Sequence, residues 1–148
     1  AEALDPADKS ISAVNLRAMV MSHREWIKTN YKREKLRHAW EEFFKDWDIL
    51  VCPQMATSAF PHDHRPFSDR TMMVDESIQP YFKQIFWAGM VVNAYLPSTV
   101  FPTGLSTSGL PIGLQAVSGQ YRDHRTIEFA RQITQHIGGF EPPSHLQK

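Results

Sequence analysis

The sequence predicts an α/β fold in which helices and short strands pack around a buried sheet. Residues 23–46 carry apolar side chains at helical spacing, and residues 48–53 form a short apolar run closed by proline. Two further strand-like runs flank a loop that contains Gly104 and Gly109. The sequence predicts about four helices and three or four strands. These are too few to cover both the fully apolar strand and a helix that is apolar all round. The chain therefore looks like part of a larger α/β core.

Composition is that of an ordinary globular protein and excludes several classes. The 148 residues suffice for one domain, and 42% are apolar. Lys and Arg balance Asp and Glu at 16 each, so no basic field points to nucleic acid or an anionic membrane. The single cysteine, Cys52, excludes a disulfide framework and a cysteine-based zinc site. No membrane span and no signal peptide are visible, so a cytoplasmic location is our default expectation.

Two helices are predicted in the first third of the chain. A short helical pattern covers residues 11–21 after a polar lead-in. Ser22 and Glu25 then form a capping box, in which the Ser22 hydroxyl accepts the Glu25 backbone amide while the Glu25 side chain reaches back. We expect the second helix to run from His23 to about Asp46.

The second helix is amphipathic. Its charged residues are interpreted as a solvated face, on which Glu41 and Lys45 stand at a spacing that favours an ion pair. Its opposite face is an apolar stripe of Trp26, Ile27, Tyr31, Leu36, Trp40, Phe43, Phe44 and Trp47.

The middle of the chain alternates strands and loops. Residues 48–53 predict a strand buried on both faces, because the run is continuously apolar. Residues 54–70 show little periodicity and predict a long irregular loop, which in a compact domain is either functional or disordered. Residues 71–74 predict a short strand.

A helix is predicted to start at Pro80, a natural first helical residue, and to reach about Asn93. Its residues are apolar nearly all round, so we expect it to be buried on every side. Residues 97–102 and 112–117 predict a pair of partner strands joined by the glycine-containing loop.

The last helix is expected to have Asp123 as its N-cap and to stop at Gly138 and Gly139. Its buried face would consist of Ile127, Ala130, Ile133 and Ile137.

The densest polar cluster is His62, Asp63 and His64 in the long loop. Two imidazoles one residue apart can ligate one metal from an extended strand. However, no third ligand stands at a defined spacing, and Arg65 places a positive charge beside them. We therefore expect no metal site and interpret the cluster as an ordered polar loop near a pocket.

Other reactive or aromatic residues are interpreted mainly as core. Cys52 ends an apolar strand, where cysteine normally packs as a small hydrophobe rather than acting as a nucleophile. Trp26, Trp40 and Trp47 stand at helical spacing and are expected in the core, whereas Trp87 precedes the strand pair and could line a pocket. No glycine-rich phosphate loop, nucleophile elbow or metal-binding helix motif is present, so no cofactor is expected.

The C-terminal half carries a family resemblance. The run from Leu96 to Gly119, followed by Asp123 onto a helix, closely resembles the C-terminal end of amidase signature enzymes, most specifically in residues 109–115. Other segments match in order and spacing, and the last is similar to the branch with bacterial amidases and fatty-acid amide hydrolase-like proteins. These segments are residues 22–26, 40–53 and 138–143.

The resemblance implies a fold and an activity. Residues 1–148 would be the C-terminal segment of a single amidase domain, contributing a few strands of the mixed sheet and covering helices to the family's α/β/α fold. The implied reaction hydrolyses a carboxylic amide to an acid plus ammonia or an amine, through a Ser–Ser–Lys triad. Such a lysine must be neutral to accept a proton, and backbone amides would hold the oxyanion.

The triad has no counterpart in these residues. The sequence contains no Ser-Ser dipeptide, and Ser106 and Ser108 stand in a turn without a base. The family's triad precedes every matched segment, so we expect the catalytic part upstream, no catalytic residue here, and no activity of this chain alone. A second departure is Tyr95, which stands where related enzymes often have glycine, with Asn93 shifted by one position.

We expect this segment to complete the sheet and to line part of an acyl-binding pocket, with Phe60, His62 and Trp87 as pocket candidates. Its partners would be a small-molecule amide substrate and the N-terminal remainder of the domain, and a homo-oligomer stays open. The alternative is a non-catalytic, amidase-like module that docks a partner on its apolar strand edge. A relative serving tRNA-linked amidotransfer is a third reading, against which the absence of a basic patch argues.

Overall fold

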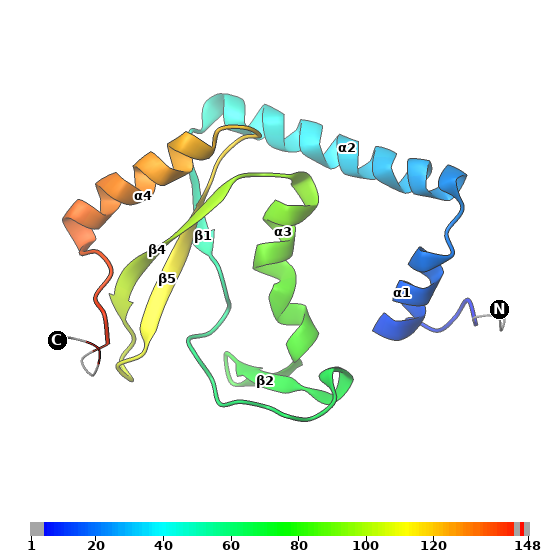
Figure 1. Ribbon diagram of the computed structural model, residues 1–148, viewed down its shortest axis with the longest axis horizontal. Helices are drawn as coiled ribbons and strands as arrows, with labels where there is room; N and C mark the ends of the chain where they lie inside the picture. Colours follow the sequence, from blue (N-terminus) through cyan, green and yellow to red (C-terminus); the bar gives the residue numbers. More distant parts are fainter. Residues whose placement is uncertain (1–4, 144–145, 147–148) are drawn as a thin grey trace.

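Helices lie on both faces of a small antiparallel sheet, which gives the chain three layers (Figure 1). The computed structural model describes residues 5–143 and residue 146. The helices are α1 (Ile11–Met19), α2 (His23–Asp46), α3 (Phe86–Ala94) and α4 (Asp123–Ile137). The strands are β1 (Leu50–Pro53), β2 (Thr71–Val74), β3 (Ser77–Pro80), β4 (Ser98–Leu105) and β5 (Pro111–Val117). Two short 3₁₀ turns cover Phe67–Asp69 and Tyr81–Ile85.

The start of α2 is set by its own sequence, as predicted. The Glu25 backbone amide donates to the Ser22 hydroxyl over 3.2 Å, and the Ser22 amide donates to the Glu25 carboxylate over 3.0 Å. This capping box satisfies two backbone donors that the first turn leaves free. The predicted bounds of α2, His23 to Asp46, are confirmed.

The three-stranded sheet has the order β1-β5-β4, with antiparallel neighbours. Successive side chains of a strand point to opposite faces, so β5 splits its residues between two cores. Leu114 and Ala116 pack on the α4 side, whereas Val117 packs on the α3 side. The predicted strand pair, the turn between them and the α/β class are confirmed.

Two apolar clusters fill the space on either side of the sheet. The cluster on the α3 side joins the C-terminal end of α2 to α3 and contains Phe44, Cys52, Val91, Ala94, Leu96 and Val117. The cluster on the α4 side contains Phe101, Ala116 and Ala130, with Ile49, Leu114, Phe129 and Ile133 against it. Figure 1 shows the long α2 reaching from this core to α1 at the far end of the molecule.

The prediction of a helix starting at Pro80 is wrong. Pro80 ends β3, opposite Thr71, in a β2–β3 hairpin whose turn residues Asp75 and Glu76 both have positive φ. Two positive φ values in a two-residue turn match the twist of hairpin strands. The chain then makes a 3₁₀ turn, and α3 begins only at Phe86.

Two elements expected to be fully buried are only partly covered by the described residues. β1 is an edge strand of the sheet, and Val51 on it is 42% exposed. In α3, Val91 and Ala94 are buried but Phe86 and Val92 lie open. The other helices and strands of the described chain therefore cover β1 and α3 on one side only.

The apolar stripe of α2 is buried only near its C-terminal end. Phe44 is fully buried and Trp40 packs against it, whereas Trp26 and Trp47 are 52% and 60% exposed. The core position expected for these last two is therefore not seen. Lys45 pairs with Glu42 rather than Glu41, whose carboxylate instead accepts the backbone amide of Gln120.

The prediction for α4 is partly wrong. Its N-cap is Arg122, without a side-chain cap bond, and the predicted cap Asp123 is the first helical residue. The helix ends at Ile137 and is followed by Gly138, whose φ of 90° suits glycine. Ala130 is buried and Ile133 packs on the core, but Ile127 and Ile137 are exposed. The buried face instead runs through Thr126 and Phe129, because Thr126 bonds to Thr99 of β4 over 2.8 Å.

None of the helices in the described part of the chain combines the length and the apolar character needed to cross a bilayer.

Candidate functional site

The long loop over residues 54–70 passes from the end of β1 to the β2–β3 hairpin and walls three neighbouring hollows. The sheet hollow, of about 470 Å³, lies between residues 53–60 and residues 111–114 at the start of β5. The hairpin hollow, also about 470 Å³, lies between residues 57–63 and residues 71–73. The histidine hollow, of about 300 Å³, is lined by Phe60, His62, Asp63, His64, Arg70 and Tyr81.

Phe60 belongs to all three hollows. Its ring meets the edge of the Tyr81 ring with centroids 5.9 Å apart, and Tyr81 meets Phe67 at 5.7 Å. Edge-to-face contacts at these distances are favourable. The aromatic trio therefore fixes the irregular loop against the hairpin.

Asp63 and Arg65 form the main ion pair of the loop. The Arg65 guanidinium donates to both carboxylate oxygens, with its Nη2 2.6 Å from Oδ2 and its Nε 3.0 Å from Oδ1. These side-chain bonds lower the pKa of Asp63 to about 2. Arg65 also reaches the Thr71 hydroxyl of β2 over 3.2 Å, which ties the loop to the hairpin.

Of the predicted pocket residues, the structure brings Phe60 and His62 together and leaves Trp87 apart. His62 lines two of the hollows, and its ring centroid is 6.0 Å from that of His64. Trp87 packs against the cluster on the α3 side, and its carbonyl accepts a bond of 3.3 Å from the Gln115 side chain. The assignment of all three to a substrate pocket stays a prediction.

Three residues of the site have no strong signal in the sequence. Arg70 and Tyr81 are joined by a backbone bond of 3.0 Å across the base of the hairpin, a proximity that only the strand register reveals. The Thr57 hydroxyl is buried between two hollows with no hydrogen-bond partner among the described residues.

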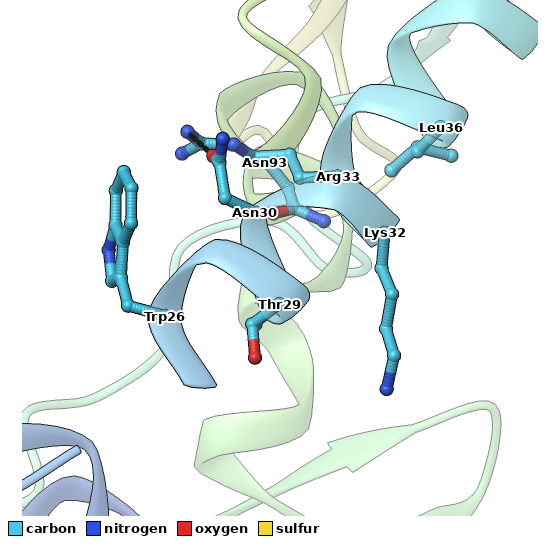
Figure 2. Close-up of a pocket in the computed structure, with 7 residues that line it drawn as sticks. All are labelled: Trp26, Thr29, Asn30, Lys32, Arg33, Leu36 and Asn93. Atoms are coloured by element: carbon cyan, nitrogen blue, oxygen red, sulfur yellow. Dashed lines mark hydrogen bonds between the residues drawn. The ribbon is translucent and has the colours of Figure 1, made fainter. Parts of the chain in front are cut away.

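A separate hollow of about 330 Å³ lies where α2 faces the end of α3 (Figure 2). Asn30 and Arg33 are hydrogen-bonded there beside Asn93, while Trp26 and Lys32 point away from them. The Arg33 guanidinium also lies 4.4 Å from the centre of the Tyr95 ring.

Groups that could act in covalent or metal chemistry are poorly placed. Cys52 is buried, and burial raises the pKa of its thiol, which suits a packing role. Ser106 and Ser108 bond to each other over 2.8 Å in an exposed turn. Residues 5–143 and 146 contain no group of three or more His, Cys, Asp or Glu side chains arranged to hold a metal ion.

The chain matches a protein-family model and known proteins over most of its length. The Amidase family model matches residues 2–127. Indoleacetamide hydrolase of Bradyrhizobium diazoefficiens is 25% identical over 133 residues, which are 86% of this chain and 23% of that protein. Fatty-acid amide hydrolase 2 of Homo sapiens is 28% identical over 122 residues, which are 82% of this chain and 20% of that protein.

A crystal structure of an amidase has a similar fold. It superimposes with a TM-score of 0.65 at 16% identity and covers 86% of this chain and 28% of that one. This chain thus spans about a quarter or less of the curated relatives named above.

Proposed function

This chain belongs to the amidase family, and from that premise we propose that it is the C-terminal segment of a single domain that hydrolyses carboxylic amides to an acid plus ammonia or an amine. Both named relatives are amide hydrolases, and the region that the family model matches includes the loop, the sheet, the helices on the α3 side and the first turn of α4. The substrate's acyl group is not fixed by these residues alone.

The observation that carries the proposal is the sheet hollow. A mobile loop would make a poor wall, but this loop is anchored at both ends. Gln115 bonds to the Pro53 carbonyl over 2.9 Å at its start, and Arg65 bonds to Thr71 near its end. The hollow therefore offers a preformed wall of Phe60 and the first residues of β5 to an apolar acyl group.

Catalysis is assigned to residues upstream of this chain. The family resemblance places a Ser–Ser–Lys triad there, and no serine, threonine or cysteine side chain among the described residues here is hydrogen-bonded to a lysine or a histidine. This segment would supply substrate-binding surface, exclude water from it, and complete the sheet. A small-molecule amide and the N-terminal remainder of the domain are its proposed partners.

Amide turnover tests the proposal directly. The full polypeptide, meaning the natural protein in which residues 1–148 occur, should release ammonia from a panel of aryl and alkyl primary amides. Residues 1–148 expressed alone should release none. Turnover by residues 1–148 alone would contradict the assignment of catalysis to upstream residues.

The pocket role of Phe60 has its own variant. Phe60→Ala in the full polypeptide should lower kcat/KM by about tenfold or more, because an apolar contact of this size is worth about 1.5–3 kcal/mol. Phe140→Ala, which removes the same ring from a 79% exposed position, should leave kcat/KM within about twofold. If both variants changed kcat/KM equally, the proposed role of Phe60 in the substrate pocket would be wrong.

A non-catalytic, partner-binding module is the second candidate. Exposed apolar side chains on α2 and α3, including Ile27, Phe86 and Val92, favour a surface that another polypeptide covers. A full polypeptide that hydrolyses no amide in the panel but folds cooperatively would favour this module over the hydrolase.

A further inference from the structure

We propose that the histidine hollow binds the carboxylate group of a small organic acid. Four of its six lining residues, namely His62, His64, Arg70 and Tyr81, carry side chains that can donate hydrogen bonds, and its volume of about 300 Å³ suits a small ligand.

The acidic side chains in and around the hollow already have hydrogen-bond partners. The acidic group in its wall, Asp63, is already bound by Nε and Nη2 of Arg65, which is not among the lining residues. Asp69 is the nearby acid beyond this pair, and it accepts a bond of 2.9 Å from Ser68. The formal charges of Arg65 and Arg70 balance those of Asp63 and Asp69. Arg70 nevertheless forms no ion pair with a carboxylate of the described residues, so its guanidinium is available to a bound anion.

Arg70 is held in place without using its terminal nitrogens. Its Nε donates to the Arg65 carbonyl over 2.8 Å, and its own carbonyl accepts the Tyr81 backbone amide over 3.0 Å. Within residues 5–143 and 146, no group accepts a hydrogen bond from its Nη atoms. A guanidinium held in this way matches the paired oxygens of a carboxylate.

Tyr81 supplies a second oriented donor. Its ring is clamped edge-on by Phe60 at 5.9 Å and by Phe67 at 5.7 Å. Its hydroxyl has no hydrogen-bond partner in the part of the chain that the structure describes. A neutral donor beside a fixed guanidinium adds geometric selectivity for an anion at little ordering cost.

A bound cation fits the hollow less well. Arg70 lines the hollow together with the two imidazoles and would repel a metal ion bound there. The carboxylate of Asp63, the natural third ligand, is occupied by Arg65.

The position of the hollow connects the acid to the proposed reaction. Phe60 separates it from the sheet hollow, so one molecule could place its amide toward the sheet and its carboxylate toward Arg70. That the acid is part of an amide substrate rests on the proposed function. The binding of a carboxylate at Arg70 is independent of the proposed function.

Calorimetric titration of the full polypeptide with benzoate and benzyl alcohol tests the site. We expect benzoate to bind at least tenfold more tightly than benzyl alcohol, which has the same ring without the charge and no amide to hydrolyse. Arg70→Gln should weaken benzoate binding about tenfold or more, as expected for a charge-assisted bond. Arg24→Gln, the same change at an exposed position on α2, should have less than a twofold effect. Equal binding of the two ligands, or an unchanged Arg70→Gln variant, would overturn the site.

Two further measurements guard against loss of folding and separate the two proposals. Tyr81→Phe keeps the clamped ring and should weaken benzoate binding several-fold, so no effect from it would contradict the donor role. Among substrates, the monoamide of glutaric acid should lose kcat/KM in Arg70→Gln, whereas pentanamide should not. Arg70-dependent benzoate binding without any amide turnover would uphold the site and reject the hydrolase, and turnover without such binding would do the reverse.

Discussion

The side-chain amide of Gln115 donates a hydrogen bond of 2.9 Å to the carbonyl oxygen of Pro53, where the chain leaves the sheet for the loop. The same amide reaches the Trp87 carbonyl at 3.3 Å, and its oxygen accepts from the Ser98 hydroxyl at 2.8 Å. One side chain, 2% exposed, thus joins β5 to β1, α3 and β4. The end of the predicted family motif at residues 109–115 has a structural role in setting where the loop begins.

Replacing Gln115 should destabilise the protein strongly. Gln115→Leu leaves the Pro53 and Trp87 carbonyls without this donor, and each unsatisfied buried group costs about 1–3 kcal/mol. Urea unfolding of the full polypeptide measures the change in free energy of unfolding. Gln135→Leu, at an exposed position of α4, should change it by less than about 0.5 kcal/mol. If Gln115→Leu changed the free energy of unfolding as little as the control does, the two carbonyls would have found other partners.

The backbone of Tyr95 has a left-handed conformation that is less favourable for tyrosine than for glycine. Its φ is 58° and its ψ is 35°, in the left-handed region that costs a residue with a Cβ atom about 1–2 kcal/mol. Tyr95→Ala and Tyr95→Gly both remove the ring under Arg33, so their difference isolates the backbone. Tyr95→Gly should be more stable than Tyr95→Ala by about 1 kcal/mol in thermal or urea unfolding. Alanine as stable as glycine would mean that the backbone relaxes.

The Asp63–Arg65 pair should persist to low pH. The Arg65 bonds lower the Asp63 pKa from 3.8 to about 2 in the folded chain. The stability from this pair is therefore fully present above pH 3.8 and is lost as the pH falls through about 2. A carbon-13 NMR titration of the Asp63 carboxyl should show a midpoint near 2. In Arg65→Gln the midpoint should move up toward 3.8, and identical midpoints in both proteins would contradict the pairing.

Phe44 and Phe43 are neighbours on α2 with very different burial. Phe44 is 2% exposed in the core on the α3 side, whereas Phe43 is 37% exposed. Phe44→Ala should cost about 3–5 kcal/mol, and Phe43→Ala about 1–2 kcal/mol. Denaturant unfolding of both variants checks the ranking. A reversed ranking would mean that residues outside the described chain cover Phe43 more fully than Phe44.

Features that depend on neighbours along the chain were predictable. The capping box at Ser22 and Glu25, the bounds of α2 and the strand pair at residues 98–117 follow from local hydrogen bonding and periodicity. The packing role of Cys52 also follows, because an apolar strand buries its cysteine.

Features that depend on packing were not predictable. A proline such as Pro80 is compatible with the first residue of a helix and with the last residue of a strand. Only its pairing with Thr71 shows that it ends a strand here. Ile127 fits the helical period of α4 but is exposed, since the Thr99–Thr126 bond fixes the helix rotation. Glu41 is spaced along α2 to pair with Lys45, but in the fold it accepts the Gln120 amide and Lys45 pairs with Glu42.

The candidate site also has a part that was predictable from the sequence and a part that was not. The family, the long loop and the candidates Phe60 and His62 on it were all predictable from the residues alone, because short segments in fixed order carry that information. Their proximity to Arg70 and Tyr81, and the packing of Trp87 against the core, became visible only in the folded chain. The physical reason is that strand register and helix packing bring together groups that the chain keeps far apart, and no local pattern encodes those distances.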